Sequence, residues 1–380
     1  MSKTIDKIIR VGIAGQGRSG YGIHANWLKR SGDLFQITAV ADQLQERRDD
    51  AQKEFGAKAY SDWRELLKAG GFDLFINALP SPLHVPATIE ALEAGYHVVC
   101  EKPMAANVKD FDLMVATAKK NGKMLAPFQN NRFQPFFQKI LEIVRSGVLG
   151  EIIYVRSSWG SYARRWDWQT IQCNMGGTLF NTGPHALDQA LMLFGEKETP
   201  SVFCRMSCHN EMGGDSDDIC AVTLSGKQSP QVEVLISGYL AYPQGDMYSI
   251  SGTRGGLKGN PNSLTWKYYD KAQAPEQDFW KTWSEKRKYT SETLPWIENH
   301  WEVPAEIAQG NKSGYTIPSY EIAVKTFYDN IASALRDGSE LLITIPQVRR
   351  QIAVIEECHR QNPLPRKYKE WVPGKGGVEV

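Results

Sequence analysis

One lysine and its neighbours are the most chemically suggestive feature of the sequence. Lys102 lies in the segment Glu101-Lys102-Pro103, directly after the apolar run that ends at Cys100. If that run is a strand of a parallel sheet, Lys102 stands at the carboxyl edge, where open α/β sheets bind ligands. A lysine there can give a proton to a substrate hydroxyl or take one from it, because burial lowers its pKa. The alternative is a lysine on a surface loop without a chemical task.

A glycine-rich turn near the start of the chain predicts a second ligand site. The segment Gly15-Gln-Gly17-Arg18-Ser19-Gly20 matches G-x-G-x-x-G and follows a predicted strand at 8–14. The first glycine permits a tight turn, the second lets the backbone approach a pyrophosphate, and the third lets a helix pack on the strand. Free N–H groups at the start of that helix would bind the phosphates. The segment therefore predicts dinucleotide contacts from Gly15, Gly17, Arg18, Ser19 and Gly20, and the alternative is a turn that binds nothing.

An acidic residue after the second predicted strand indicates which dinucleotide is bound. Asp42 follows the run 35–41, about 20 residues beyond the glycine turn. An acid here accepts a hydrogen bond from the ribose 2′-hydroxyl of NAD and repels the 2′-phosphate of NADP. Arg47 and Arg48 would favour NADP, but they lie a full helical turn beyond Asp42. The sequence predicts NAD as the cofactor, with NADP less favoured.

The elements that must position these residues follow from the hydrophobic pattern. Up to residue 130, short apolar runs alternate with amphipathic helical patterns, which predicts β-α-β units and a parallel sheet with helices on both faces. Asn107 is expected to cap one helix, with Phe111 and Met114 on its apolar face. The predicted strands are 8–14, 35–41, 73–79, 96–100 and 124–128. Residues 1–130 are therefore expected to form an α/β dinucleotide-binding domain.

The pattern changes from residue 151 onward. Alternating and β-branched residues with polar connections predict strands at 151–159, 201–208, 219–224, 231–239 and 247–252. Helical spacing recurs at 184–194, at 323–335 and after Pro346. Residues 131–380 are expected to form an α+β domain with a large, mostly antiparallel, open-faced sheet, whose last helices can pack back on the first domain. No helix or strand is predicted in the Trp-rich connection 272–315.

Composition excludes several classes of protein. Lys and Arg (44) balance Asp and Glu (43), which argues against nucleic acid as the main partner. No apolar run approaches the ~20 residues that span a bilayer, and the first residues lack the features of a secretory signal. The six cysteines are expected to be reduced thiols of a cytoplasmic protein. No metal site is expected, because the group Cys204, Cys208 and His209 is not followed by a second pair of ligands at the spacing of a zinc site.

Four segments together resemble the Gfo/Idh/MocA family of oxidoreductases. They are the glycine turn, Glu101-Lys102-Pro103, the stretch 176–188 that contains Asn181-Thr-Gly-Pro-His185-Ala-Leu-Asp188, and Tyr248-Ser-Ile-Ser-Gly-Thr-Arg-Gly-Gly256, which is similar to the family's I-x-G-T-x-G-G. The resemblance covers nearly the whole chain. It implies a Rossmann domain, a second domain, and hydride transfer between a nicotinamide cofactor and a sugar or cyclitol carbon.

The resemblance also implies which residues react. Lys102, His185 and the position of Asn181 would flank the reacting hydroxyl. Family members commonly have Asp where this chain has Asn181, four residues before His185, and the two side chains share a face if the stretch is helical. An amide can position a hydroxyl but cannot take a proton. Lys102 or His185 would then act as the general base. Asp188 becomes a candidate for orienting one of these partners at the substrate.

Further cofactor contacts are expected at the same sheet edge. The family places ribose contacts in the turn after a strand, which here contains Leu79, Pro80 and His84. Glu101 and Lys102 follow the next strand along the chain. The segment Asn130-Asn131-Arg132 follows the last strand, where it could contact nicotinamide or substrate, or equally cap the crossover between the domains.

A loop before the histidine motif combines aromatic, cationic and acidic side chains. Sugar C–H faces stack on Trp and Tyr, and sugar hydroxyls bond to Arg and Asp. The loop therefore predicts a carbohydrate pocket, and the alternative is an oligomer-interface loop with the same residue types. The candidates are Tyr162, Arg164, Arg165, Trp166 and Trp168.

Three functions remain compatible with the sequence. The first is an NAD-dependent dehydrogenase acting on a secondary ring hydroxyl of a sugar, glycoside or cyclitol. The second is an enzyme that cleaves glycosides through transient oxidation and elimination. The third is a non-catalytic sugar- or NAD-binding protein, to which the change to Asn181 points. The resemblance further implies a homo-oligomer (dimer, tetramer or hexamer) built through the second sheet.

Overall fold

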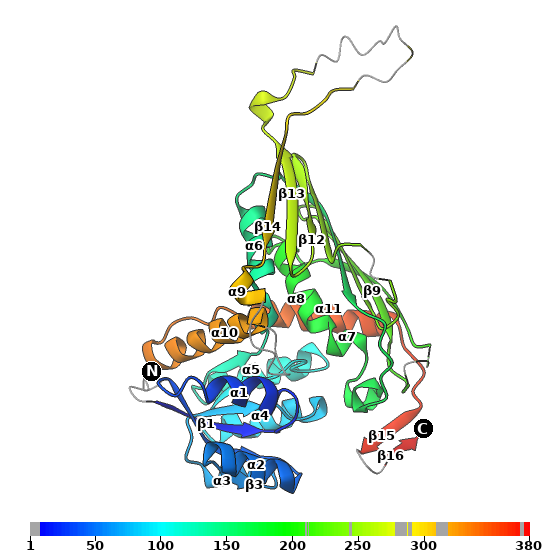
Figure 1. Ribbon diagram of the computed structural model, residues 1–380. Coiled ribbons are helices and arrows are strands. Elements are labelled where there is room, and N and C mark those ends of the chain that lie inside the picture. Colours follow the sequence, from blue (N-terminus) through cyan, green and yellow to red (C-terminus); the bar gives the residue numbers. More distant parts are fainter. Residues whose placement is uncertain are drawn as a thin grey trace.

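Two sheets and the helices around them make up the computed structural model (Figure 1). The structure describes residues 8–209, 211, 213–242, 245–277, 287, 291–308, 318–372 and 376–380. Trp280 and Trp283 of the Trp-rich connection lie outside this part of the chain. Among the described helices, none is long and apolar enough to cross a membrane.

The first sheet is parallel and has the strand order β3-β2-β1-β4-β5-β6. Its strands are β1 (Ile9–Ala14), β2 (Phe35–Ala41), β3 (Lys58–Tyr60), β4 (Leu74–Asn77), β5 (His97–Cys100) and β6 (Leu125–Pro127). The five predicted strands are confirmed, and β3 is an addition. Because all strands run the same way, the glycine turn after β1, Asp42 after β2 and Lys102 after β5 lie along one edge.

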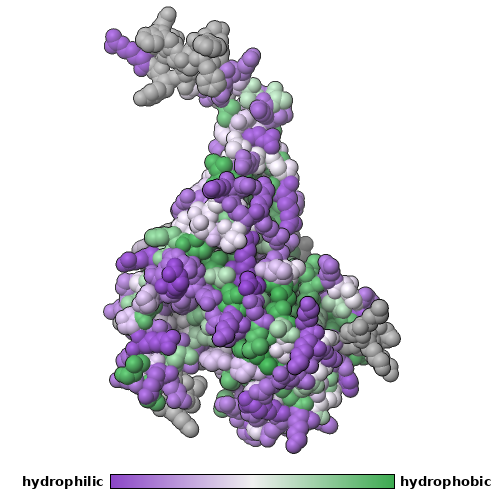
Figure 2. All heavy atoms as spheres, turned by 180° about the vertical axis from the view of Figure 1, so that it is seen from behind, coloured by the Kyte–Doolittle hydropathy of each residue, from purple (hydrophilic) through white to green (hydrophobic). Residues whose placement is uncertain are grey.

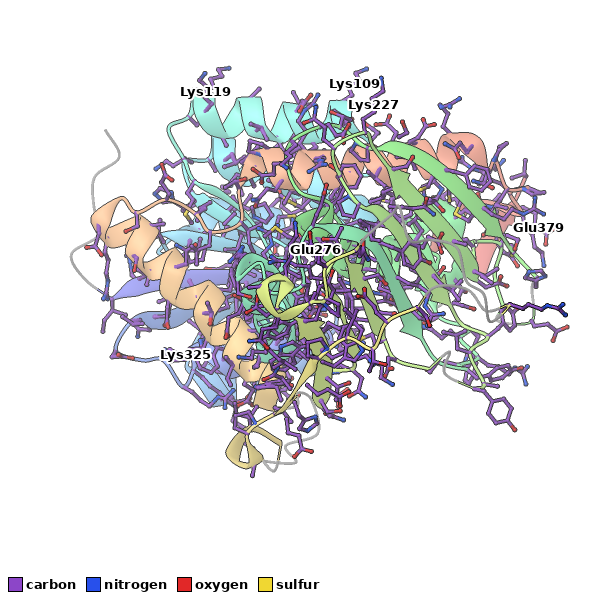
Figure 3. All side chains as sticks on the ribbon, turned by 90° about the horizontal axis from the view of Figure 1, so that it is seen from above. Lys109, Lys119, Lys227, Glu276, Lys325 and Glu379 are labelled. Atoms are coloured by element: carbon purple, nitrogen blue, oxygen red, sulfur yellow. The ribbon has the colours of Figure 1, made fainter. Side chains whose placement is uncertain are left out.

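Helices cover both faces of this sheet. They are η1 (Gly20–Ala25, a π-helix), α1 (Asn26–Leu28), α2 (Gln45–Phe55), α3 (Trp63–Ala69), η2 (Ser81–Leu83), α4 (His84–Glu93) and α5 (Val108–Lys120). The Asn107 side chain accepts a hydrogen bond from Asp110 N at 2.8 Å, so it caps α5 as expected. On the outer side of α5, Lys119 points away from the body (Figure 3).

The crossover after β6 contains elements that the hydrophobic pattern did not reveal. Asn130–Phe133 form the short η3, and α6 (Pro135–Arg145) follows directly. Pro135 stands at the first helical position, where its missing N–H costs no hydrogen bond. The buried face of α6, with Phe136, Phe137 and Ile140, packs into the core of the second half.

The second sheet has eight strands in the order β14-β13-β12-β11-β7-β10-β9-β8. They are β7 (Ile152–Gly160), β8 (Ser201–Ser207), β9 (Ile219–Ser225), β10 (Gln231–Ser237), β11 (Tyr248–Gly252), β12 (Gly255–Gly259), β13 (Ser263–Tyr269) and β14 (Trp296–Glu302). Every pairing is antiparallel except that of β7 with β10. The predicted, mostly antiparallel sheet is confirmed.

One face of the second sheet is covered by helices and the other is open. Helices α7 (Thr178–Asn181), α8 (Gly183–Phe194) and α11 (Ile345–Gln361) lie against the covered face (Figure 1). On the other face, the Phe203 side chain is 68% exposed. The end of the sheet formed by β12, β13 and β14 projects from the body as a narrow extension (Figure 2).

The last helices connect the two cores. Helix α10 (Pro318–Asp337) inserts Phe327, Tyr328 and Ile331 into the core of the first sheet. Helix α11 contributes Ile352 to that core and Ile355 to the second one. The remaining elements are η4 (Trp168–Thr170), η5 (Gln172–Asn174), η6 (Lys271–Gln273), α9 (Ala305–Ala308), β15 (Tyr368–Val372) and β16 (Gly376–Glu379).

Candidate active site

The glycine turn between β1 and η1 has the geometry of a dinucleotide site. Gly15 has φ +90°, and a Cβ there would lie 2.3 Å from the Ala78 carbonyl oxygen. A Cβ on Gly20 would lie 1.7 Å from the Gly15 oxygen, so both positions require glycine. At Gly17 the nearest atom would be 3.7 Å away, which leaves room beside the backbone. This open cradle, flanked by Arg18 and Ser19, fits a pyrophosphate.

Asp42 closes the cradle from the end of β2. Its Oδ2 accepts a hydrogen bond from Gln16 N at 2.7 Å, and its Oδ1 accepts one from Leu44 N at 2.9 Å. The side chain of Arg47 curls back, so that its Nη1 lies 3.3 Å from Oδ2 of Asp42. The expectation that Arg47 stands a full turn away from Asp42 is therefore wrong, because its long side chain spans the distance along the helix. A positive charge therefore lies directly beside the Asp42 carboxylate.

The turn after β4 is held by His84. Its Nδ1 lies 2.7 Å from the carbonyl oxygen of Pro103, and its Nε2 lies 2.8 Å from the carbonyl oxygen of Leu79. Burial lowers the pKa of His84, so the neutral ring carries one N–H and donates to one of these two carbonyl oxygens. The buried His84 lies between the turn of Leu79 and Pro80 and the lysine turn, and both of its ring nitrogens face protein carbonyls.

Unpartnered polar atoms surround the same edge. Nδ2 of Asn130 is buried and has no hydrogen-bond partner among the described residues, while its Oδ1 lies 3.5 Å from the Tyr320 hydroxyl. Oε1 of Gln16, in the glycine turn, is also buried and finds no partner in the part of the chain that the structure describes. Orphaned donors and acceptors of this kind are costly unless a ligand satisfies them. Together with the cradle at Gly17, they fit a bound nicotinamide dinucleotide.

Lys102 links the two halves of the molecule at this edge. Its Nζ donates to the backbone oxygen of Asn181 at 2.7 Å and lies 3.4 Å from Oδ1 of the same residue. Burial lowers the pKa of Lys102; the Glu101 carboxylate opposes this change, and Arg18 and Arg165 add to it. A lysine whose pKa is lowered in this way can exchange a proton with a substrate hydroxyl.

Glu101 is buried beside the lysine and remains ionised. Its burial alone would raise its pKa, but the hydrogen bond from His24 and the charges of His24 and Lys102 outweigh burial and lower the pKa to about 2. Its Oε2 accepts a hydrogen bond from the Lys102 backbone N–H at 3.0 Å. Glu101 therefore shapes the lysine turn from within the protein.

Asn181 and His185 lie on two short helices. Asn181 is the last residue of α7, the helix is interrupted at Thr182, and His185 lies in the first turn of α8. The stretch is therefore helical but not one continuous helix. Burial, followed by the charge of Lys102, lowers the pKa of His185 to about 3, so its imidazole is neutral near pH 7. Its Nδ1 is buried, and no described residue forms a hydrogen bond with it.

Asp217 holds α7 in place, and sequence reasoning missed it. Its Oδ2 accepts from the Thr178 hydroxyl at 2.6 Å and from Leu179 N at 2.8 Å. A Cβ on Gly177 would lie 1.9 Å from its Oδ1. Burial raises the pKa of Asp217 to about 6. The acidic run Asp215-Ser-Asp-Asp218, all of it buried, was the available signal.

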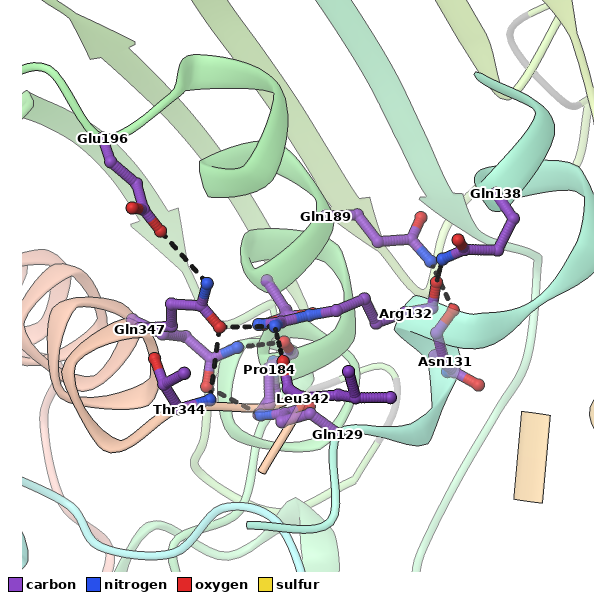
Figure 4. A network of polar contacts seen from close by, with 12 residues as sticks. Gln129, Asn131, Arg132, Gln138, Pro184, Gln189, Glu196, Leu342, Thr344 and Gln347 are labelled. Atoms are coloured by element: carbon purple, nitrogen blue, oxygen red, sulfur yellow. Dashed lines mark hydrogen bonds and ion pairs between the residues drawn. The ribbon is translucent and has the colours of Figure 1, made fainter. Parts of the chain in front are cut away.

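Arg132, the last residue of the segment expected to contact the ligands or to cap the crossover, pairs with Asp188. Arg132 Nη2 and Nε lie 2.5 and 2.9 Å from the Asp188 carboxylate, and both side chains are at most 4% exposed. Arg132 also donates to Oε1 of Gln347 and to the carbonyl of Leu342 (Figure 4). The Asp188 carboxylate is therefore bound by Arg132 in the crossover between the sheets. Its contacts do not support the expectation that Asp188 contacts the substrate.

The aromatic loop is largely exposed. Trp166 is 84% exposed and Tyr162 is 55% exposed. Arg165 makes a two-pronged ion pair with Asp167, both contacts at 2.9 Å, and Arg164 is exposed. Trp168, in η4, is half-buried. Arg165 acts electrostatically on Lys102, which brings this part of the loop to the lysine edge, whereas Trp166 extends into solvent.

The fold and this edge define a two-domain nicotinamide-dependent oxidoreductase. The model of the oxidoreductase family with an NAD-binding Rossmann fold matches residues 9–129, and that of the GFO/IDH/MocA C-terminal domain matches residues 137–258. The chain belongs to the Gfo/Idh/MocA family.

Curated relatives and solved structures agree with this membership. A scyllo-inositol 2-dehydrogenase (NADP(+)) of Bacillus subtilis is 27% identical over 92% of both chains. A D-glucoside 3-dehydrogenase of Escherichia coli is 32% identical over 51% of this chain and 56% of the relative. The WlbA dehydrogenase of Bordetella pertussis, solved with NADH and UDP-GlcNAcA, shares the fold with a TM-score of 0.74, at 22% identity over 95% of this chain and 97% of that one.

Proposed function

We propose that the protein is an NAD-dependent dehydrogenase that oxidises a secondary ring hydroxyl of a sugar, glycoside or cyclitol. The observation that carries the proposal is the position of Lys102. Its backbone follows β5 at the edge of the first sheet that holds the glycine turn, and its Nζ reaches Asn181 of the second domain. A hydroxyl bound at this ammonium would lie between the cofactor cradle and His185. Relatives named for inositol and glucoside dehydrogenation support the polyol substrate.

In this proposal Lys102 is the general base. In its neutral form it takes the proton of the substrate hydroxyl, and the two Asn181 oxygens accept hydrogen bonds from the resulting ammonium. His185, neutral near pH 7, can orient the hydroxyl through a hydrogen bond but brings no imidazolium proton. When bound, the nicotinamide supplies the hydride acceptor.

The cofactor in this proposal is NAD, with NADP less favoured. The Asp42 carboxylate faces the ribose position and is held there by two backbone N–H groups. An anion there opposes a 2′-phosphate. Arg47 weakens this preference because it already contacts Asp42 and could turn to a phosphate. The remaining cofactor contacts proposed are Gly15, Gly17, Arg18, Ser19, Gly20, Leu79, Pro80 and Asn130.

The substrate contacts proposed are those of the loop before α7. Arg165 and the half-buried Trp168 would bind a sugar ring and its hydroxyls, because they lie on the part of the loop near Lys102. Tyr162, Arg164 and the exposed Trp166 would reach a substrate only from the outer rim.

We further propose a homo-oligomer formed through the open face of the second sheet. Phe203, Tyr154 and Leu235 alternate with core residues along their strands and therefore point to that face. A large exposed aromatic such as Phe203 is typical of an interface. Light scattering should show twice the chain mass or more, and Phe203→Glu should shift it toward the monomer. We also propose a cytoplasmic location, because the cysteines form no disulfide in the part of the chain that the structure describes.

A substrate panel tests the proposed function. Sugars, glycosides and inositols are incubated with NAD and, separately, with NADP, and absorbance at 340 nm is followed together with product. The proposal expects NADH in proportion to ketone for at least one polyol. Product without NADH would instead identify a glycoside-cleaving enzyme that regenerates its cofactor, and no response with any polyol would contradict the dehydrogenase.

A further inference from the structure

A buried chain of hydrogen bonds joins three distant segments beside the lysine. The Tyr328 hydroxyl on α10 lies 2.5 Å from Nδ1 of His24 in η1. Nε2 of His24 lies 3.3 Å from Oε1 of Glu101. The other oxygen, Oε2, accepts from the Lys102 backbone N–H. His24, Tyr328 and Glu101 are at most 5% exposed, so water cannot replace any of these contacts.

The backbone of η1 explains why His24 points inward. His24 N donates to the oxygen of Ser19, five residues earlier, which is a π-helical turn. Such a turn changes which side chains face the sheet, and π-turns often occur at functional sites. The Phe128 ring packs on the imidazole, with 4.4 Å between centroids, and fixes its plane.

Glu101 sets the direction of the hydrogen bonds. An ionised carboxylate only accepts, so Nε2 of His24 must carry the proton that it donates to Oε1. Nδ1 faces the Tyr328 hydroxyl, which can both donate and accept a hydrogen bond, so this contact holds the imidazole in the orientation in which Nε2 points to Glu101.

Lys102 and Glu101 are adjacent, yet their side chains form no ion pair among the described residues. Both carboxylate oxygens are taken, one by His24 and the other by a backbone N–H. The Lys102 ammonium bonds to Asn181 instead. We propose that His24, held by Tyr328, is a positioning residue that keeps the Glu101 carboxylate away from the Lys102 ammonium, which is thereby left available to the substrate of the proposed function, on which this inference rests.

The groups around the lysine define what release of Glu101 would do. Lys102 is influenced by Glu101, Arg18 and Arg165, and Glu101 by His24, Lys102 and His84. His185, Tyr320 and Tyr328 also face this pair. A carboxylate that turns to the ammonium would stabilise its charged form, so the lysine would lose its proton only at higher pH.

The test measures the titration of Lys102 without substrate or cofactor. The full-length protein is labelled with acetic anhydride across a pH series, and acetylation of Lys102 is quantified by mass spectrometry. His24→Leu should raise the midpoint by about one pH unit or more, and Tyr328→Phe should raise it by less. His24→Gln, whose amide can still donate to Glu101, should stay near the wild-type midpoint.

A matched control separates positioning from general loss of stability. Tyr96 also donates from a partly buried hydroxyl, to the Leu67 carbonyl at 3.1 Å, but at the opposite end of β5. Tyr96→Phe should leave the midpoint unchanged. If thermal melting shows that His24→Leu is not folded, the midpoint of Tyr328→Phe decides whether the inference holds. An unchanged or lower midpoint in the folded variants overturns the inference, and because no substrate is used, this result is independent of whether the protein oxidises a polyol.

Discussion

Lys102 and Asn181 connect the loop after β5 in the first sheet to α7 on the second, through a hydrogen bond of 2.7 Å from Nζ to the backbone oxygen. The side-chain oxygen of Asn181 lies 3.4 Å from the same Nζ. Neither oxygen carries a full negative charge, so the lysine is held without being locked into its charged form. This relationship makes Lys102 the group whose protonation should govern activity.

The pH dependence of the wild-type enzyme should report Lys102 and not His185. Oxidation requires the neutral amine, so kcat/KM should be present above the pKa of Lys102 and fall as the pH drops through it. Burial places that pKa below the ordinary 10.5. His185, with a pKa of about 3, should produce no limb near 6.5. Initial rates across pH 5–10 check this, and a limb near 6.5 that His185→Gln removes would contradict it.

Replacing the amide at position 181 by a carboxylate should move this limb. In Asn181→Asp an anion lies beside Nζ of Lys102 and stabilises the ammonium form. This should raise the pKa of Lys102 by about 1–3 pH units. The limb of kcat/KM should therefore shift to higher pH, with a lower rate at pH 8. Asn181→Ala is the control: it keeps the backbone acceptor, adds no charge, and should leave the limb near its wild-type position. Identical profiles for Asp and Asn would refute this role.

Asp42 and Arg47 should set the choice between NAD and NADP. Asp42→Asn removes the charge that opposes a 2′-phosphate and releases Arg47 to bind it. The ratio of kcat/KM for NAD to that for NADP should fall by about tenfold, as expected for one charged hydrogen bond. The double variant Asp42→Asn, Arg47→Ala should lose the gain with NADP. A ratio that none of these variants changes would show that the ribose binds elsewhere.

The Arg132–Asp188 pair should matter for stability. Removing one partner leaves a buried charge uncompensated, which costs about 3–5 kcal/mol. Arg132→Met and Asp188→Leu should each lower the melting temperature strongly, and the double variant should recover part of the loss. The exposed pair Arg360–Glu357 serves as control, and Arg360→Ala should barely change the melting temperature. Additive losses in the double variant would argue against a coupled pair.

The sequence was most informative where burial produces simple patterns. Strands β4 and β5 are buried along their whole length, and β1 and β2 are mostly buried, with one exposed residue each, Arg10 and Gln36, so all four form short, mainly apolar runs. Strand β12 escaped prediction because glycines interrupt it, whereas β13 escaped although its sequence alternates as a strand does. Helix α6 also escaped prediction, although Phe136, Phe137 and Ile140 form its apolar face.

The candidate site was predictable as far as motifs reach. The glycine turn, Lys102 and His185 belong to recognisable segments, and Lys102 does meet Asn181. The residues that hold them come from far along the chain: His24 and Tyr328 are 304 positions apart, and Arg132 and Asp188 are 56 apart. Such pairs depend on the three-dimensional packing of the helices, which a local pattern does not contain.

Deuterium transfer in the Lys102→Met variant tests the central claim most directly. A polyol that reacts in the panel, deuterated at the reacting carbon, is incubated with NAD and either the wild type, Lys102→Met, or the surface control Lys109→Met. The account predicts deuterated NADH in equal amount to ketone for the wild type and the control, and a rate about 10²–10⁴ times lower for Lys102→Met with unchanged NADH binding. Full activity of Lys102→Met, or ketone without deuterated NADH, would contradict it.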